Sequence, residues 1–566
     1  MTDARDDSIM KQRFVRRPLS LIGLAVASAT YAAALMPSLL PRALTFLVFL
    51  TALGTIGGYA LGSTVSWAIN KSMWIRRHRP GRRIGIALVG LVWIPSLVFT
   101  PIAVTWQSEQ QSQLDMPSTL PGTLILLVAV LLASAVLLLL GRSVRLMTAN
   151  LAKAIAAIPP LHRRISRALP ARRRRAIAGL RLLVTIVLIA ILSSLLTAGF
   201  QRLVASYDTV NADMSGQSKA LIGTNSGGRG SLVSWETLGR QGRSFVDNPM
   251  TAAQISQISH QPAVDPLRLY VGMQQGGTAQ ERSDLAVREI DRSGAWHRKY
   301  LAIFVVTGTG WVDPNGINSL EAVTGGDIAT VAVQYSAVPS WIGFVIDPDT
   351  AMQQGASQVR TIVDAWRRQP AATRPELILF GQSLGAFGSQ AAWPQDATPQ
   401  DVVADIPKVI WVGPPAQSPL WERWQAGRTG GPAWQPVIGD GRITHVFVTP
   451  EELSIAQPMT GPAITYTAHA NDPVVYWSPS LFLHHPDWIA DPLGPGVDPH
   501  LRYLYAITYL AVGFDLIGGG EPPEVGHNYS ANIGPAVALT LNTPGWTRAA
   551  TRRLQAALPG LVYPTD

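Results

Sequence analysis

Residues 381–385, Gly-Gln-Ser-Leu-Gly, place a serine between two glycines in the pattern G-x-S-x-G. The segment follows an apolar run at 376–380 and precedes an expected helix over 384–393. Glycines on both sides of a serine permit a sharp strand-to-helix turn, which presents the hydroxyl of Ser383 at a helix N-terminus. The alternative is a plain turn built from small residues, but the strand before it and the helix after it favour a nucleophile.

A serine hydroxyl is a weak nucleophile unless a base takes its proton and an acid orients that base. Asp472 follows an expected strand at 464–467, and His527 is the last of ten histidines. Ser383, Asp472 and His527 therefore occur in the chain order expected around a nucleophile elbow. Other acids and bases remain candidates, namely Asp487, Asp491, Asp498, Asp515, His469, His484, His485 and His500. We expect His469 to be a hydrogen-bonded structural residue.

The negative charge that develops on a carbonyl oxygen during acyl transfer needs two N–H donors. The backbone N–H of Leu384 is one candidate, because it follows the nucleophile directly. Thr309 or Gly310, in the glycine-rich turn 307–311, is the candidate for the other. No lysine lies near this turn and no phosphate-loop sequence follows it, so it does not predict a nucleotide site.

Neither a cofactor nor a metal is expected to take part in this chemistry. The pair His484–His485 lies next to Asp487, but no third ligand follows at the spacing of a metal site. The chain also contains no cysteine, which excludes a thiolate nucleophile, a thiolate metal site and a disulfide.

Short apolar runs that alternate with helical stretches must position these residues. The runs are 301–306, 328–335, 376–380, 409–412 and 464–467. Strands alternating with helices predict a mostly parallel sheet covered on both faces, here over residues 299–566. Residues 417–438 fall between two expected strands and are a candidate cap. Trp421 and Trp424 of that segment are candidate substrate contacts, with packing on the sheet as the alternative.

The first 200 residues predict a transmembrane helical domain. A helix needs about 20 apolar residues to cross the hydrocarbon core. Five runs meet this length, at 19–40, 43–69, 84–106, 120–140 and 177–200. A weaker run at 144–158 contains two basic residues and predicts an interfacial helix. Residues 201–298 contain no long apolar run and predict a partly helical connecting segment.

Charge is distributed very unevenly between the two parts of the chain. Residues 1–200 carry 23 Lys and Arg against 5 Asp and Glu, and the remainder carries 23 against 31. The basic residues lie between apolar runs rather than on a polar face, which argues against nucleic-acid binding. They concentrate in the tail before the first run and in the second and fourth connections. The positive-inside rule then predicts a cytoplasmic N-terminus and, after five spans, an extracytoplasmic C-terminal domain.

Motifs along almost the whole chain resemble the actinobacterial family of membrane-anchored α/β-hydrolases. The matching segments are 37–42 (PSLLPR), 234–242 (SWETLGRQG), 307–314 (TGTGWVDP), 334–336 (QYS), 339–341 (PSW), 381–385, 469–473 (HANDP), 486–488 (PDW) and 526–529 (GHNY). The resemblance implies an α/β-hydrolase fold with a mostly parallel sheet behind a multi-helix membrane domain. It also implies the same serine, acid and histidine positions. Gln382 departs from the acidic residue common at that place in the family.

Together these patterns predict an integral membrane serine hydrolase in the plasma membrane, with an extracytoplasmic site. Proximity to the bilayer favours lipid esters as substrates, with membrane lipids as substrate or environment and no nucleic-acid partner. Transfer of the acyl group to an alcohol acceptor is an alternative to hydrolysis. A catalytically silent scaffold or lipid-binding protein is an alternative of a different class, against which the complete set of Ser383, Asp472 and His527 argues.

Overall fold

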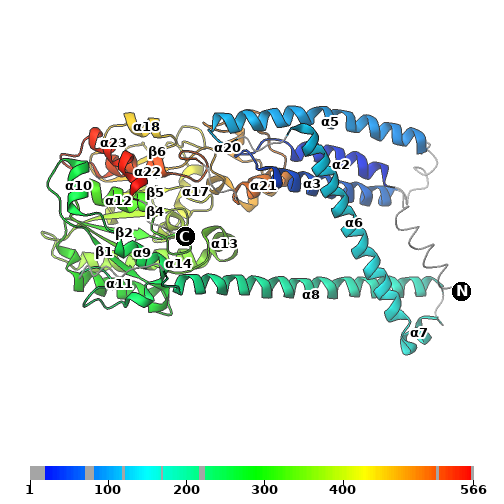
Figure 1. Cartoon of the computed structure of the whole chain (residues 1–566), viewed down its shortest axis with the longest axis horizontal. Helices are drawn as coiled ribbons and strands as arrows, with labels where there is room; N and C mark the ends of the chain where they lie inside the picture. The colour runs from blue at the N-terminus through cyan, green and yellow to red at the C-terminus, as the bar shows by residue number, and fades with distance from the viewer. Residues whose placement is uncertain are drawn as a thin grey trace. The chain divides into compact units, whose positions relative to one another are not determined.

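The computed structural model describes residues 19–69, 82–117, 122–166, 170–215, 224–517 and 522–561. The chain forms two compact units. The helical unit comprises Met1–Pro37, Pro41–Gln111 and Pro117–Leu203, and the α/β unit comprises Ser38–Leu40, Ser112–Met116 and Val204–Asp566. The basic tail before the first apolar run and the basic connection at 70–81 lie outside the described residues. Figure 1 shows the chain and labels many of the elements of both units.

Long helices dominate the first part of the chain. They are α2 (Leu21–Ala34), α3 (Leu44–Ile69), α5 (Arg82–Gln113), α6 (Thr123–Ala156), α7 (Pro159–Ser166) and α8 (Pro170–Ala212). Among the described residues, four segments are long and apolar enough to cross a membrane, namely Leu44–Ile69, Arg83–Gln113, Thr123–Ala156 and Arg175–Ala212. These four helices indicate a multi-pass membrane protein.

The first expected span is wrong in length. Helix α2 has 14 residues, which rise about 21 Å and fall short of the hydrocarbon thickness of about 30 Å. Ser20 caps its N-terminus by accepting the N–H of Gly23, and Pro37 ends the helical conformation at its other end. The helix expected at 144–158 is not a separate element, because α6 continues through to Ala156 without a break.

Close approach of α2 and α3 is made possible by glycines spaced four residues apart on α3, at Gly54, Gly58 and Gly62. A methyl group on Gly62 would lie 2.7 Å from the carbonyl oxygen of Ile22, and one on Gly58 would collide with Thr30. Small residues at such spacing let helix backbones touch inside a membrane, where no hydrophobic effect drives helices together.

The α/β unit is built on a seven-stranded sheet in which every pair of neighbours is parallel. Its strands are β1 (Leu267–Val271), β2 (Tyr300–Val305), β3 (Ile328–Val333), β4 (Glu376–Gln382), β5 (Lys408–Val412), β6 (Thr444–Phe447) and β7 (Ala463–Thr467). They are arranged in the order β1-β3-β2-β4-β5-β7-β6. The parallel sheet expected from the alternating pattern is thus confirmed.

Helices cover both faces of this sheet (Figure 1). The described helices of the α/β unit are α9 (Gly239–Asp247), α10 (Ala252–Ser259), α11 (Ala279–Ser293), α12 (Pro314–Val323), α13 (Ser340–Ile346), α14 (Pro348–Arg367), α15 (Leu384–Gln390), α16 (Pro399–Asp405), α17 (Pro419–Ala426), α18 (Pro450–Ile455), α19 (Pro473–Tyr476), α20 (Asp487–Ala490), α21 (Ala506–Asp515), α22 (Ser530–Leu541) and α23 (Arg548–Ala557). Helices α11, α14 and α15 pack together as one layer, and α10, α12, α22 and α23 as the other. The inner strands β2, β3, β4, β5 and β7 are buried on both sides, which explains their largely apolar sequences.

The edge strand β1 lies inside the segment 201–298, so the α/β unit begins earlier in the chain than residue 299. An arginine interrupts this strand, and the sequence pattern therefore hides it. The structure buries the guanidinium of Arg268 completely, with its Nε 2.6 Å from Oε1 of Glu321 on α12. A buried charge requires such a partner, and Glu321 supplies it from 53 residues away.

Two glycines of α3 test the packing of α2 against α3. Gly62→Ala should lower the melting temperature of the full-length protein in detergent, because overpacking costs about 1–3 kcal/mol. Gly57→Ala is the matched control, because nothing lies within 4 Å of a methyl group there. Its helix propensity should improve by about 1 kcal/mol, so its melting temperature should equal or exceed that of the wild type. Equal melting temperatures for the two variants would contradict close packing at Gly62.

Candidate active site

Ser383 sits at the sharp turn between β4 and α15. Its backbone has φ 53° and ψ −122°, a strained conformation for a residue with a side chain. The two glycines of the motif are required because a methyl group on Gly381 would lie 2.7 Å from the carbonyl oxygen of Gly385. One on Gly385 would collide with the carbonyl of Val305 in β2. The Ser383 N–H donates to the carbonyl of Val412 at 2.8 Å, which fixes the turn to the end of β5.

Asp472 lies in the loop between β7 and α19, five residues after Thr467, and is fully buried. Its Oδ1 accepts the N–H of Val474 at 2.8 Å, so it caps the short helix α19. Its Oδ2 accepts from His527 Nδ1 at 2.7 Å and from the hydroxyl of Tyr529 at 2.6 Å. With its proton held on Nδ1 by the carboxylate, His527 has Nε2 as its basic nitrogen.

A glycine brings His527 to the edge of the sheet where Ser383 lies. Gly413 follows Val412 and has φ +53°, and a methyl group there would lie 2.7 Å from His527 Cε1. The imidazole therefore rests against the backbone that follows β5, one residue beyond the carbonyl that holds Ser383. Because β4 and β5 are neighbours in the sheet, both side chains lie at its carboxyl edge.

His469 occupies a different position from His527. It is buried, with Nδ1 2.9 Å from the carbonyl of Gly526 and Nε2 3.1 Å from Oδ1 of Asn532. Its ring stacks on that of Tyr529 at a centroid distance of 4.1 Å. Burial lowers the pKa of His469, which favours the neutral ring. These contacts hold the loop that carries His527.

Tyr529 is a site residue that the sequence reasoning missed. Its hydroxyl donates to Asp472 and accepts the backbone N–H of His469 at 3.0 Å. Burial raises the pKa of Tyr529 well above its ordinary value, so the hydroxyl keeps its proton. The available signal is its place in the segment 526–529, two residues after the histidine.

The competing acids make other contacts. Asp487 and Asp491 form ion pairs with Arg428, at 3.0 and 3.2 Å. Asp498 bonds the ring of His500 at 2.9 Å, and Asp515 accepts the backbone N–H of Leu40 at 3.4 Å. His484 and His485 are exposed. The geometry thus singles out Asp472 as the acid whose carboxylate meets His527.

The glycine-rich turn 307–311 follows β2, whose neighbour in the sheet is β4. Gly310 uses its N–H inside the turn, donating to the carbonyl of Thr307 at 2.9 Å. Across the described ranges no acceptor is found for the N–H of Thr309 or for that of Leu384 in the first turn of α15. The turn itself is fixed, because the Thr309 carbonyl accepts from Gln334 and that of Gly310 from Tyr270. Thr309 rather than Gly310 is thus the second candidate donor.

Asp313 connects this turn to the nucleophile segment. It caps α12 by accepting the N–H of Asn315 at 2.7 Å, and its carboxyl also hydrogen-bonds the side chain of Gln382. Burial raises the pKa of Asp313 to about 6, well above its ordinary value of 3.8. Asp313 therefore contacts the residue that directly precedes Ser383.

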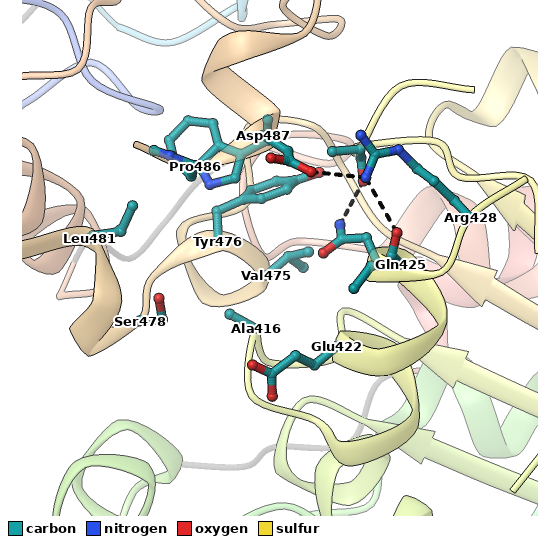
Figure 2. A pocket seen from close by; sticks show the side chains of 13 residues that line it. Ala416, Glu422, Gln425, Arg428, Val475, Tyr476, Ser478, Leu481, Pro486 and Asp487 are labelled. Atoms are coloured by element: carbon teal, nitrogen blue, oxygen red, sulfur yellow. Dashed lines mark hydrogen bonds and ion pairs between the residues drawn. The ribbon is translucent and has the colours of Figure 1, made fainter. Parts of the chain in front are cut away.

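Trp421 and Trp424 are buried in the core rather than turned towards a substrate. The ring of Trp421 lies 4.7 Å from that of Tyr466, and the ring of Trp424 lies 6.2 Å from that of Trp411. The opposite side of α17 borders a cavity of about 200 Å³, shown in Figure 2. Its lining includes Glu422, Gln425, Arg428, Val475, Tyr476 and Asp487. Val475 and Tyr476 belong to α19, so the cavity adjoins the helix that Asp472 caps.

The raised pKa of Asp313 predicts a pH-dependent loss of stability. Between pH 3.8 and about 6 the folded chain binds this proton while the unfolded chain releases it. The contribution of the protonated Asp313 carboxyl to the free energy of unfolding is therefore complete below about pH 4 and is lost as the pH rises through 6. Asp313→Asn presents an NH2 donor group and a carbonyl acceptor without a charge, and in this it resembles the protonated carboxyl. Its melting temperature should exceed that of the wild type at pH 7.5, and the difference should shrink towards pH 4.5. A difference independent of pH would contradict the assignment.

Comparison with known families accounts for both parts of the chain. Residues 267–554 match the model of a family described as "Alpha/beta-hydrolase family". Residues 35–249 match the model of its N-terminal region, described as "Alpha/beta-hydrolase family N-terminus". No curated protein and no solved structure matches the chain. The first match spans more than half of the sequence and covers Ser383, Asp472 and His527. The chain therefore belongs to this alpha/beta-hydrolase family and carries the N-terminal domain of that family before its seven-stranded parallel sheet.

Proposed function

We propose that this hydrolase is an integral membrane serine esterase whose site faces away from the cytoplasm and acts on lipid esters. The observation that carries the proposal is the hydrogen bond of 2.7 Å between Asp472 and His527, at the sheet edge where the strained turn presents Ser383. A serine, a base and a buried acid in this arrangement suit nucleophilic acyl transfer.

The reaction follows from the positions of these groups. Ser383 Oγ attacks the ester carbonyl while His527 Nε2 takes its proton, and the carboxylate of Asp472 stabilises the imidazolium. The N–H groups of Leu384 and Thr309 bind the oxyanion of the tetrahedral intermediate. His527 returns the proton to the leaving alcohol, which leaves an acyl group on Ser383. Water then releases the acid, or a second alcohol accepts the acyl group in the alternative transacylation.

Chain connectivity supports the orientation. The segments Ser38–Leu40 and Ser112–Met116 belong to the α/β unit, and two long helices, α3 and α5, separate them. Helices α6 and α8 separate the second segment from Val204. The chain therefore crosses the membrane an even number of times between any two of its segments in the α/β unit. The basic connections at 70–81 and 157–174 then fall on the opposite side of the membrane. The positive-inside rule favours the cytoplasm for those two connections and the extracytoplasmic side for the α/β unit. Because α2 is too short to cross the membrane, this orientation also places the start of α2 on the extracytoplasmic side, which replaces the cytoplasmic N-terminus expected from five spans.

The first test concerns the nucleophile and its base, and uses the full-length protein in detergent. Ser383→Ala should abolish labelling by a fluorophosphonate, because only an activated serine reacts with that probe. His527→Ala and Asp472→Asn should each lower turnover of a soluble short-chain ester by roughly a thousandfold. The losses should not add in the double variant of Ser383 and His527, because the residues act as one unit.

His500→Ala is the matched control, since His500 is also bonded to an aspartate, Asp498, but lies on another loop. It should keep turnover near the wild-type value. Labelling that persists in Ser383→Ala would exclude Ser383 as the nucleophile. Near-full activity of Asp472→Asn would exclude the acid assigned here.

Reporter fusions test the orientation separately. Alkaline phosphatase folds into an active enzyme only outside the cytoplasm, so a fusion at Asp566 should be active and one at Arg83 inactive. The reason is that Arg83 lies at the basic start of α5, one crossing away from the α/β unit. Phosphatase activity at Arg83 would reverse the orientation while leaving the chemistry of Ser383 untouched.

A further inference from the structure

Three neighbouring elements of the α/β unit expose large apolar side chains. Helix α13 exposes Trp341, Val345 and Ile346, each more than half accessible to solvent. The 3₁₀ turn Pro479–Phe482 and the residue after it expose Phe482 and Leu483, and α21 with its cap exposes Leu510 and Tyr505. We refer to these seven side chains as the apolar face. Soluble proteins rarely expose so many large apolar side chains together on their surface, so we expect another molecule to cover the apolar face.

A row of aromatic rings makes these elements continuous. The ring centroid of Phe344 on α13 lies 6.3 Å from that of Trp477. The ring of Trp477 stacks on that of Tyr509 on α21, with 5.4 Å between their centroids. Tyr509 in turn lies 5.8 Å from Phe482. Tyr505 caps α21 with φ 45° and ψ −127°, a strained backbone that holds an exposed tyrosine.

The apolar face borders the candidate nucleophile. A methyl group on Gly343 of α13 would lie 3.5 Å from the side chain of Leu384, the residue after Ser383. Phe344 also contacts Phe387 of α15 at 6.0 Å. At the start of α13, Ser340 Oγ accepts the N–H of Gly308 in the glycine-rich turn. Helix α13 therefore connects the two segments that supply the candidate oxyanion donors.

The same face begins close to where the chain enters the membrane. Asp515, the last residue of α21, accepts the backbone N–H of Leu40 at 3.4 Å. Leu40 lies four residues before α3 begins, and four residues span at most about 14 Å. Neither α13 nor α21 contains a charged residue before Asp515. Exposed Trp and Tyr among aliphatic residues are typical of the membrane–water interface.

We propose that the apolar face docks on the leaflet next to the α/β unit and passes the acyl chain of a lipid ester across α13 to Ser383. The occupant is bilayer lipid, because the face adjoins a chain segment that leads directly into a span. Docking on the membrane does not depend on the proposed esterase function. The delivery of an acyl chain to Ser383 rests on the proposed function. The two parts therefore need separate measurements.

Docking is tested by a label that reports depth in the membrane. The chain contains no cysteine, so Ile346→Cys can be labelled at one position with the fluorophore NBD. In phosphatidylcholine vesicles, lipids carrying a nitroxide on the acyl chain should quench this label. The matched control is Ile455→Cys on α18, where the native side chain is 73% exposed and lies outside the face. Its label should respond to iodide in water and not to the nitroxide lipids.

Labels at both positions that respond only to iodide would overturn the docking. Protection of the Ile346 label that grows with protein density and ignores the nitroxide lipids would also overturn it, because a second copy would then cover the face. Neither measurement depends on turnover, so the result stands even if the chain proves not to be an esterase.

Delivery is tested by comparing two esters in proteoliposomes. Ile346→Asp should lower turnover of a long-chain ester in the bilayer about tenfold more than turnover of a soluble short-chain ester, because a charge opposes apolar insertion. Ile455→Asp should leave the ratio of the two rates at the wild-type value. Equal losses on both esters in Ile346→Asp would overturn delivery through the face. Absence of turnover of either ester in the wild type would instead count against the proposed function.

Discussion

The burial of one carboxylate organises the whole candidate site. Asp472 is fully excluded from solvent, and a buried charge is tolerated only when hydrogen-bond donors surround it. Val474, His527 and Tyr529 supply three donors within 2.8 Å, from the cap of α19 and from the loop before α22. Because these segments are 55 or more residues apart, the carboxylate ties the end of β7 to the histidine loop.

Glycines make the approach of the remaining parts possible. Gly381 and Gly385 allow the strained turn at Ser383, and Gly413 leaves room for the imidazole of His527. Strain at Ser383 persists because backbone contacts on β2 and β5 fix both sides of the turn. Thr309 and Leu384, whose N–H groups are the candidate oxyanion donors, follow the neighbouring strands β2 and β4 at the same edge of the sheet.

Segments next to the apolar helices complete the α/β unit. Leu39 is buried in its main core, and Leu40 and Leu114 form a small buried cluster with Val525. Val525 lies two residues before His527, so this cluster supports the loop that carries the histidine. Segments of the family's N-terminal domain therefore contribute to the core of the α/β unit, and a fragment that begins after α8 would lack these three leucines.

The sequence alone determined the features that depend on local pattern. Apolar runs and their spacing predicted the parallel sheet and four of the apolar helices, because strand and helix formation depend on neighbouring residues. The G-x-S-x-G motif and the order of Ser383, Asp472 and His527 indicated the candidate residues.

Tertiary structure decided everything that depends on a distant partner. Glu321 allows Arg268 to be buried within β1, and the hydroxyl of Tyr529 joins the site by donating to Asp472. Trp421 is buried because Tyr466 packs against it, and Thr309 rather than Gly310 has an available N–H because of the fold of its turn.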